Sequence, residues 1–143
     1  MSKTPRIVLD TSTVVSGVIG GISAEVIDLL REGAFQAIVS EEILQEYAAV
    51  LRRPRFGFPG WVIEDILNFF ATQSIRVVPR RQVDAIAEDP EDNKFLEAAI
   101  AGEADYILSG DQHLLHLSTF EGIPIMSSRQ FLLLLKGNPG WAK

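Results

Sequence analysis

The stretch "DPEDNKFLEAAIAGEADYILSGD", residues 89–111, contains a helix followed directly by a strand. Residues 90–101 carry apolar side chains at the spacing of one helix face, namely Phe95, Leu96, Ala99 and Ile100. The run "YILS" at 106–109 is typical of a short buried strand, and Gly110 ends it. A helix that leads into a strand in this way is a building block of parallel sheets.

The same alternation extends in both directions along the chain. Further strands are expected at residues 6–10, 35–39, 75–78 and 124–126. Further helices are expected at residues 24–32, 41–53, 61–72 and 128–135, with a short one after Asp111 and with Asp89 capping the helix at 90–101. Strands that alternate with helices predict an α/β fold with a central, mainly parallel sheet covered on both faces.

The composition narrows the class of protein. The chain has 143 residues, 47% of them hydrophobic, which suits a single domain over residues 1–143. It has no cysteine, so disulfides, thiolate zinc sites and cysteine nucleophiles are excluded. No run approaches the ~20 apolar residues of a membrane helix, and we expect a soluble, cytoplasmic protein that binds no membrane. The net charge of −6 disfavours non-specific nucleic-acid binding through the overall field, but it allows a local basic patch or bound cations.

Two acids follow predicted strands directly. Asp10 comes after the apolar run at 7–9, and Asp111 comes after the strand at 106–109. In an open α/β sheet, ligands bind beyond the carboxyl ends of the strands, so these carboxylates converge if their strands are neighbours. The alternative for Asp111 is a helix N-cap, and the alternative for Asp10 is the cap of a following turn or helix, because aspartate is a preferred capping residue.

Two more acids lie on predicted helices. Asp92 falls near the middle of the apolar stripe of residues 90–101, so its side chain is expected to face the sheet. The helix dipole also favours an acid in a first turn, but it does not explain the inward direction. Glu46 borders the apolar face of the helix at 41–53, and Glu41 borders the opposite edge, so periodicity does not choose between them.

Three or four carboxylates at one sheet edge repel one another, and no lysine is expected beside them. Hard divalent cations are their natural partners, because Mg²⁺ and Mn²⁺ prefer oxygen ligands. Such ions activate water and offset charge on a leaving oxygen, which favours hydrolysis of phosphodiesters. His113 and His116 lie in one short segment and make a poor zinc set, so no metal role is favoured for them.

Three blocks of the sequence carry a family resemblance: "IVLDTSTVVSGVI", "SEEILQEYAAVLRRPRF" and "DPEDNKFLEAAIAGEADYILSGDQHLL". Together they resemble the PIN-domain nucleases, and most closely the toxin branch of bacterial and archaeal toxin–antitoxin pairs, from Arg6 to about Leu135. The resemblance implies a three-layer α/β/α sandwich with a central parallel sheet. It also implies a ribonuclease that depends on Mg²⁺ or Mn²⁺, cleaves single-stranded RNA, is silenced by a cognate antitoxin protein and commonly forms a homodimer.

The resemblance also implies particular site residues. The catalytic, metal-binding acids of the family correspond to Asp10, Glu46, Asp92 and Asp111, which favours Glu46 over Glu41. Ser109 corresponds to the family's Ser or Thr before the last acid, a hydrogen-bonding helper. The family usually has Asn two residues after its first Asp, and here that residue is Ser12. A serine hydroxyl still donates and accepts a hydrogen bond, but it reaches less far than an amide.

Basic and aromatic residues are candidate contacts to a nucleic acid. Those after the helix at 41–53 are Arg52, Arg53, Arg55, Phe56 and Phe58. The arginines would contact phosphates and the rings would stack on bases. Lys94, which lies close to Asp92, would steady a phosphate, and Arg80 and Arg81 form a second basic pair. The alternative for each is a solvated surface residue, and Trp61 and Trp141 are expected to be packing or interface residues.

Three other functions are compatible with parts of the sequence. A degenerate domain that kept the fold but serves as a binding or regulatory module is motivated by Ser12. A phospho-acceptor receiver domain needs paired acids after the first strand, whereas "IVLDTS" offers Asp10 alone. A haloacid-type phosphatase needs a second Asp two residues after the first, which "DTST" lacks.

Overall fold

A six-stranded sheet forms the centre of the molecule in the computed structural model, which describes residues 4–83 and 90–137. The strands lie in the order β3-β2-β1-β4-β6-β5, and all neighbours are parallel except β5 and β6. Their bounds are β1 (Arg6–Leu9), β2 (Gln36–Val39), β3 (Ile75–Arg76), β4 (Tyr106–Leu108), β5 (Thr119–Phe120) and β6 (Ile123–Met126). The mainly parallel sheet predicted from the sequence is confirmed.

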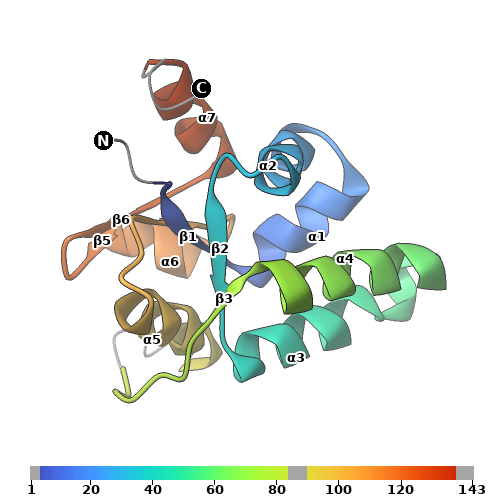
Figure 1. Cartoon of the computed structure of the whole chain (residues 1–143), viewed down its shortest axis with the longest axis horizontal. Helices are drawn as coiled ribbons and strands as arrows, with labels where there is room; N and C mark the ends of the chain where they lie inside the picture. The colour runs from blue at the N-terminus through green and yellow to red at the C-terminus, as the bar shows by residue number, and fades with distance from the viewer. Residues whose placement is uncertain (1–3, 84–89, 138–143) are drawn as a thin grey trace.

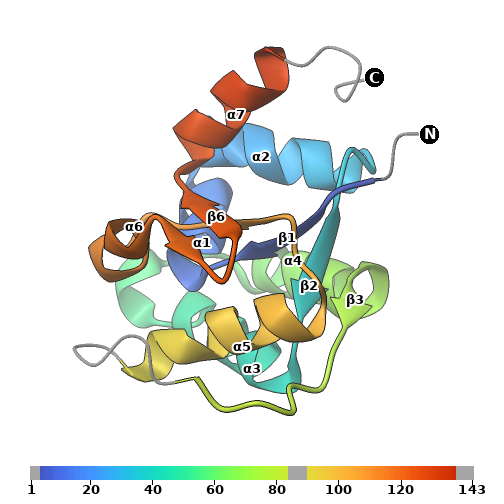
Figure 2. The same ribbon diagram turned by 90° about the vertical axis from the view of Figure 1, so that its left-hand side faces the viewer.

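Helices cover both faces of the sheet. They are α1 (Thr11–Ile19), α2 (Ile22–Arg31), α3 (Glu41–Leu51), α4 (Gly60–Gln73), α5 (Asn93–Ala101), α6 (Gln112–Leu117) and α7 (Ser128–Lys136), with 3₁₀ turns η1 (Pro54–Phe56) and η2 (Pro90–Asp92). Figure 1 shows α1, α3 and α4 on one side of the strands and α5 on the other. Figure 2 shows α7 beside α2 at one end of the molecule. The result is the predicted α/β/α sandwich.

The central strand β1 explains where the site forms. Its residues Ile7, Val8 and Leu9 are 0% exposed, as expected for a parallel strand covered on both faces. It lies between β2 and β4, and the chain proceeds from β1 toward β3 on one side and from β4 toward β5 on the other. This reversal of strand order next to β1 opens a crevice beyond the carboxyl ends of β1 and β4.

The structure corrects several sequence-based boundaries. The sequence predicted only a turn or helix after Asp10, whereas α1 runs from Thr11 to Ile19 and buries Val14 and Val15. The single helix expected at 90–101 is a 3₁₀ turn followed by α5. The sequence did not predict β5, the antiparallel partner of β6, because β5 has only two residues. The turn between the two strands contains Gly122, whose φ of 84° suits glycine. The N-cap predicted at Asp89 lies outside the described residues.

The described helices differ in length and in apolar content. Among residues 4–83 and 90–137, no single helix is long and apolar enough to cross a bilayer, and α1 with α2 meets the criterion only as a pair bent by 99°. Both helices contribute buried side chains to the core described above.

Candidate active site

A cavity of about 690 Å³ opens at the carboxyl ends of β1 and β4. Each of the four acids predicted as site residues lines it: Asp10, Glu46, Asp92 and Asp111. They come from the end of β1, the middle of α3, the end of η2 and the start of α6. The fold therefore brings together acids that are as far apart in the sequence as Asp10 and Asp111.

Asp10 is the most buried of these acids, with 2% of its surface exposed. Its Oδ1 accepts the backbone N–H of Thr13 at 2.9 Å, which makes Asp10 the N-cap of α1. The hydroxyl of Ser12 lies 2.9 Å from both carboxylate oxygens, and the hydroxyl of Ser109 donates to Oδ2. Burial raises the pKa of Asp10, and the hydrogen bonds from Ser109, Thr13 and Ser12 oppose that rise.

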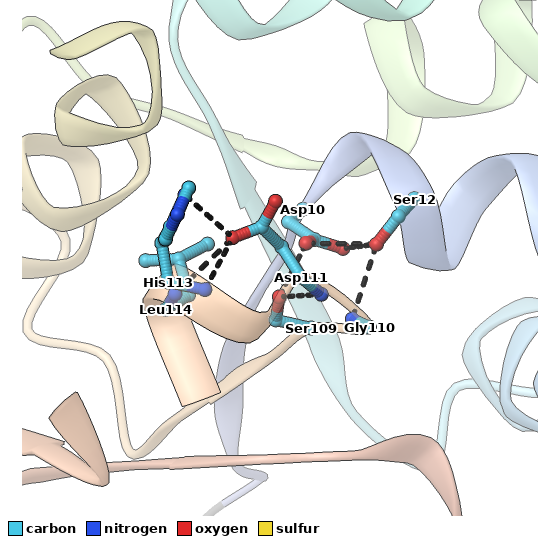
Figure 3. Close-up of polar contacts among 7 residues, drawn as sticks. All are labelled: Asp10, Ser12, Ser109, Gly110, Asp111, His113 and Leu114. Carbon is cyan, nitrogen blue, oxygen red and sulfur yellow. Dashed lines mark hydrogen bonds and ion pairs between the residues drawn. The ribbon is translucent and has the colours of Figure 1, made fainter. Parts of the chain in front are cut away.

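The two serines connect Asp10 to the chain beyond β4 (Figure 3). Ser12 Oγ accepts the backbone N–H of Gly110 at 3.1 Å, and Ser109 Oγ accepts the backbone N–H of Asp111 at 2.8 Å. Each hydroxyl therefore accepts from the segment after β4 and donates to Asp10. Ser12, where the family usually has Asn, reaches Asp10 despite its shorter side chain.

Asp111 has two roles in the structure. Its Oδ1 accepts the backbone N–H groups of His113 at 2.8 Å and Leu114 at 3.3 Å, so it caps α6. In Figure 3 every dashed line from the Asp111 carboxylate leaves this one oxygen. The capping and site interpretations of Asp10 and Asp111 are therefore compatible, because both caps stand at the cavity.

Asp92 faces inward, as its place on the apolar stripe predicted. It is half-buried, it lines the cavity, and its Oδ2 is shielded from solvent. The neighbouring acid Glu91 also lines the cavity but is exposed. Both acids lie in η2, just before α5, so nearness to the start of α5 does not by itself account for the inward direction of Asp92.

Glu46 is held by two side chains. The hydroxyl of Thr11 donates to Oε2, and the ammonium of Lys94 pairs with Oε1, with 13% of the Lys94 side chain and 22% of the Glu46 side chain exposed. The expectation that no lysine stands beside the acids was wrong. Glu41 instead faces Arg76 at the surface, 3.7 Å away, so only Glu46 of this pair reaches the cavity.

Tyr47 forms a buried hydrogen bond to the strand that leads to Asp10. Its ring is 0% exposed and its hydroxyl donates to the carbonyl of Leu9, the residue before Asp10. Burial and the nearby charges of Asp10 and Glu46 raise its pKa well above the ordinary tyrosine value. The phenol therefore stays protonated and keeps its hydrogen bond to β1.

Three residues offer donor atoms close enough to hold one cation. They are Asp92, Asp111 and His113, and one ligand atom from each lies within 4.8 Å of the other two. This set was found among the residues that the structure describes. Asp10 and Glu46 line the same cavity but do not join this compact set. Sequence reasoning missed His113, although its place two residues after Asp111, in the first turn of α6, was a usable signal.

The part of the chain that forms the cavity matches a known protein family. A PIN-domain profile matches residues 6–113, from β1 to the start of α6, and so includes all four acids. This chain belongs to the PIN-domain family. Among curated proteins, none matches it. PIN domains are generally metal-dependent nucleases, and two carboxylates with an imidazole beside further acids are a donor set that fits a divalent cation.

The predicted substrate contacts of this PIN domain divide into two groups. Arg53 and Arg55 line the acid cavity, together with Phe56. Arg52 instead pairs with Glu64 at the surface. Lys94 lines the cavity, where it pairs with Glu46, and its predicted contact to a phosphate stays a prediction.

The aromatic candidates and Arg81 also have partners within the protein. Phe56 stacks on Phe58 with ring centres 5.4 Å apart, and the Arg55 guanidinium lies 4.8 Å from the Phe56 ring centre. Arg81 pairs with Glu121 at the surface. Trp61 is 75% exposed, so it is not packed within this chain, and its place at an interface stays a prediction. Trp141 lies outside the described residues.

Proposed function

We propose that this PIN domain is a metal-dependent endoribonuclease that hydrolyses phosphodiester bonds of single-stranded RNA with Mg²⁺ or Mn²⁺. The observation that carries the proposal is the cavity in which Asp10, Glu46, Asp92 and Asp111 meet at the carboxyl ends of β1 and β4. Hydrolysis of a phosphodiester needs an activated water and a means to offset charge on the leaving oxygen. A divalent cation bound in the cavity supplies both.

The residues of the chain have distinct parts in this proposal. Asp92 and Asp111 would hold the cation, and Asp10 lines the same cavity. Ser12 and Ser109 fix the Asp10 carboxylate through their bonds to Gly110 and Asp111. Such fixing matters because a misplaced catalytic group can cost orders of magnitude in rate.

The nucleic acid would approach over the basic rim of the cavity. Arg53 and Arg55 line the cavity, and the net charge of −6 of the whole chain gives phosphates no general attraction to the protein. The choice of RNA as substrate, and of single strands, rests on the resemblance of the three sequence blocks to the toxin branch of the family. The same resemblance supports a toxin silenced by a cognate antitoxin, a homodimer and a cytoplasmic location.

Cleavage assays test the enzymatic part of the proposal. Purified protein is mixed with single-stranded RNA and Mg²⁺ or Mn²⁺, beside Asp92→Asn and the matched control Glu91→Gln. The inward acid is required and the exposed acid is not, so we expect Asp92→Asn to lose at least about 100-fold in rate while Glu91→Gln keeps it. Equal cleavage by wild type and Asp92→Asn would point to a contaminating nuclease and reject the proposal.

Two further measurements address the alternatives. Calorimetric titration with Mn²⁺ separates a nuclease from a degenerate binding module, which would show no metal binding that depends on the carboxylates. Co-expression with the product of an adjacent gene for a small DNA-binding protein tests the toxin assignment. We expect a stable complex that suppresses cleavage, and failure to co-purify would reject that partner.

A further inference from the structure

We propose that His113 is a metal ligand, and that Asp92, Asp111 and His113 form a single-ion site that selects a first-row transition ion such as Mn²⁺ over Mg²⁺. The inference rests on the proposed function to the extent that the cavity must bind a divalent cation. It goes further in naming an imidazole ligand and an order of ion preference.

The position of His113 is set by the α6 cap. Its backbone N–H donates to Asp111 Oδ1 at 2.8 Å, which fixes its Cα beside that carboxylate. Its ring Nδ1 lies 3.8 Å from the same oxygen. The imidazole is thus held next to Asp111 by the local fold, and not by a chance contact between distant surfaces.

The spacing of the donor atoms suits one ion. Ligands about 2.1 Å from an ion with octahedral geometry lie about 3 Å apart when adjacent and about 4.2 Å apart when opposite. The three donors lie within 4.8 Å of one another, so small side-chain rotations bring them onto a common centre. About half of the His113 side chain is exposed, which leaves its ring room to turn.

Glu46 and Asp10, which line the same cavity, are already bonded within the protein. Glu46 is paired with Lys94 and accepts from Thr11. Asp10 accepts from Thr13, Ser12 and Ser109 around both of its oxygens. The Lys94 ammonium already neutralises one carboxylate, which reduces the demand for a second metal ion.

A nitrogen ligand changes which ion is preferred. Mg²⁺ takes oxygen ligands almost exclusively and requires near-ideal octahedral geometry. First-row transition ions accept imidazole readily, with affinities that rise from Mn²⁺ toward Cu²⁺. Removal of His113 should therefore weaken Mn²⁺ binding and leave Mg²⁺ binding nearly unchanged.

The chain offers its own control, because His116 lies on the same short helix and is also exposed. Calorimetry measures Mn²⁺ and Mg²⁺ affinities for wild type, His113→Ala and His116→Ala. Pulsed electron paramagnetic resonance of the Mn²⁺ complex detects a nitrogen atom bound to the ion. We expect nitrogen coupling in wild type and His116→Ala, its loss in His113→Ala, and a fall of about 10-fold in Mn²⁺ affinity in that variant only.

The outcomes separate the two proposals. Mn²⁺ binding that Asp92→Asn abolishes, without nitrogen coupling in wild type, would overturn the role of His113 and leave the nuclease proposal standing. Coupling that is lost in His116→Ala instead would also overturn it. No Mn²⁺ binding at all would reject both proposals. The wild-type spectrum decides the matter even if His113→Ala does not fold.

Discussion

Lys94 forms an ion pair with Glu46 inside the acid-lined cavity, joining the first turn of α5 to the middle of α3. Both side chains are largely buried, and Glu46 also accepts from Thr11. The pair lowers the electrostatic cost of gathering acids in one place, so the cavity does not depend entirely on a bound cation. It also links the two helices on opposite faces of the sheet.

Replacement of Lys94 by Met should change both the stability of the protein and its affinity for a cation. Loss of the ammonium leaves a partly buried carboxylate beside other acids, so we expect the free energy of unfolding without metal to fall by about 1–3 kcal/mol. Cation affinity should rise, because the cavity becomes more negative. Urea denaturation in EDTA and calorimetry with Mn²⁺ measure the two effects. Lys94→Arg keeps the charge and serves as the control; unchanged stability and affinity in Lys94→Met would refute the prediction.

Ser12 should act by positioning Asp10. Ser12→Ala removes the bridge from Asp10 to the Gly110 N–H, and we expect a loss of about 1 kcal/mol in stability and about 10-fold in the rate of RNA cleavage, with little change in KM. Ser16→Ala is the matched control, since Ser16 lines the same cavity one turn along α1. A change confined to KM would instead mark Ser12 as a substrate contact.

The raised pKa of Asp10 predicts a pH-dependent stability. Burial raises the folded-state pKa above 3.8, so the folded protein holds the Asp10 proton more tightly than the unfolded chain does. Without metal, the contribution of Asp10 to the free energy of unfolding therefore falls as pH rises from 3.8 through the raised pKa, and it then stays low. Asn at this position keeps the cap and carries no charge.

We accordingly expect Asp10→Asn to unfold at higher denaturant concentration than wild type at pH 7 in EDTA, with the difference vanishing below about pH 3.8. Asp28→Asn, which changes an exposed acid on α2, should show no such pH-dependent difference. A gain for Asp10→Asn that is the same at both pH values would contradict the assignment to Asp10 ionisation.

The arginines after α3 should differ in their effect on RNA binding. Arg53 and Arg55 line the cavity, whereas Arg52 pairs with Glu64 outside it. Arg53→Ala and Arg55→Ala should each raise KM for single-stranded RNA several-fold and reduce its salt dependence, because each removes a phosphate contact. Arg52→Ala is the control and should leave KM unchanged. Equal increases in KM for all three substitutions would indicate that only the overall charge of the protein matters.

The sequence was most informative where one short segment determines the outcome. The strands around Val8 and Ile107 are continuous apolar runs, so the sheet and the acids at its carboxyl edge could be predicted. Asp10 and Asp111 carry capping signals, and both are caps. Asp92 was placed inward by the period of one helix, and it lines the cavity.

The sequence was least informative about contacts between elements. Lys94 and Glu46 lie on different helices, 48 residues apart, and nothing in either segment specifies their pairing. Periodicity left Glu41 and Glu46 equivalent until α3 was packed against α1 and α5. His113 was passed over because two histidines alone make a poor metal site, whereas the structure adds carboxylates from η2 and the α6 cap.

The proposed function requires that the carboxylates of the cavity hold a divalent cation. The most direct test is anomalous diffraction from a crystal soaked in Mn²⁺. We predict a manganese peak within bonding distance of Asp92 and Asp111, in the cavity that Asp10 also lines. A crystal with excess Mn²⁺ that shows no peak there, or peaks only elsewhere on the surface, would contradict the account.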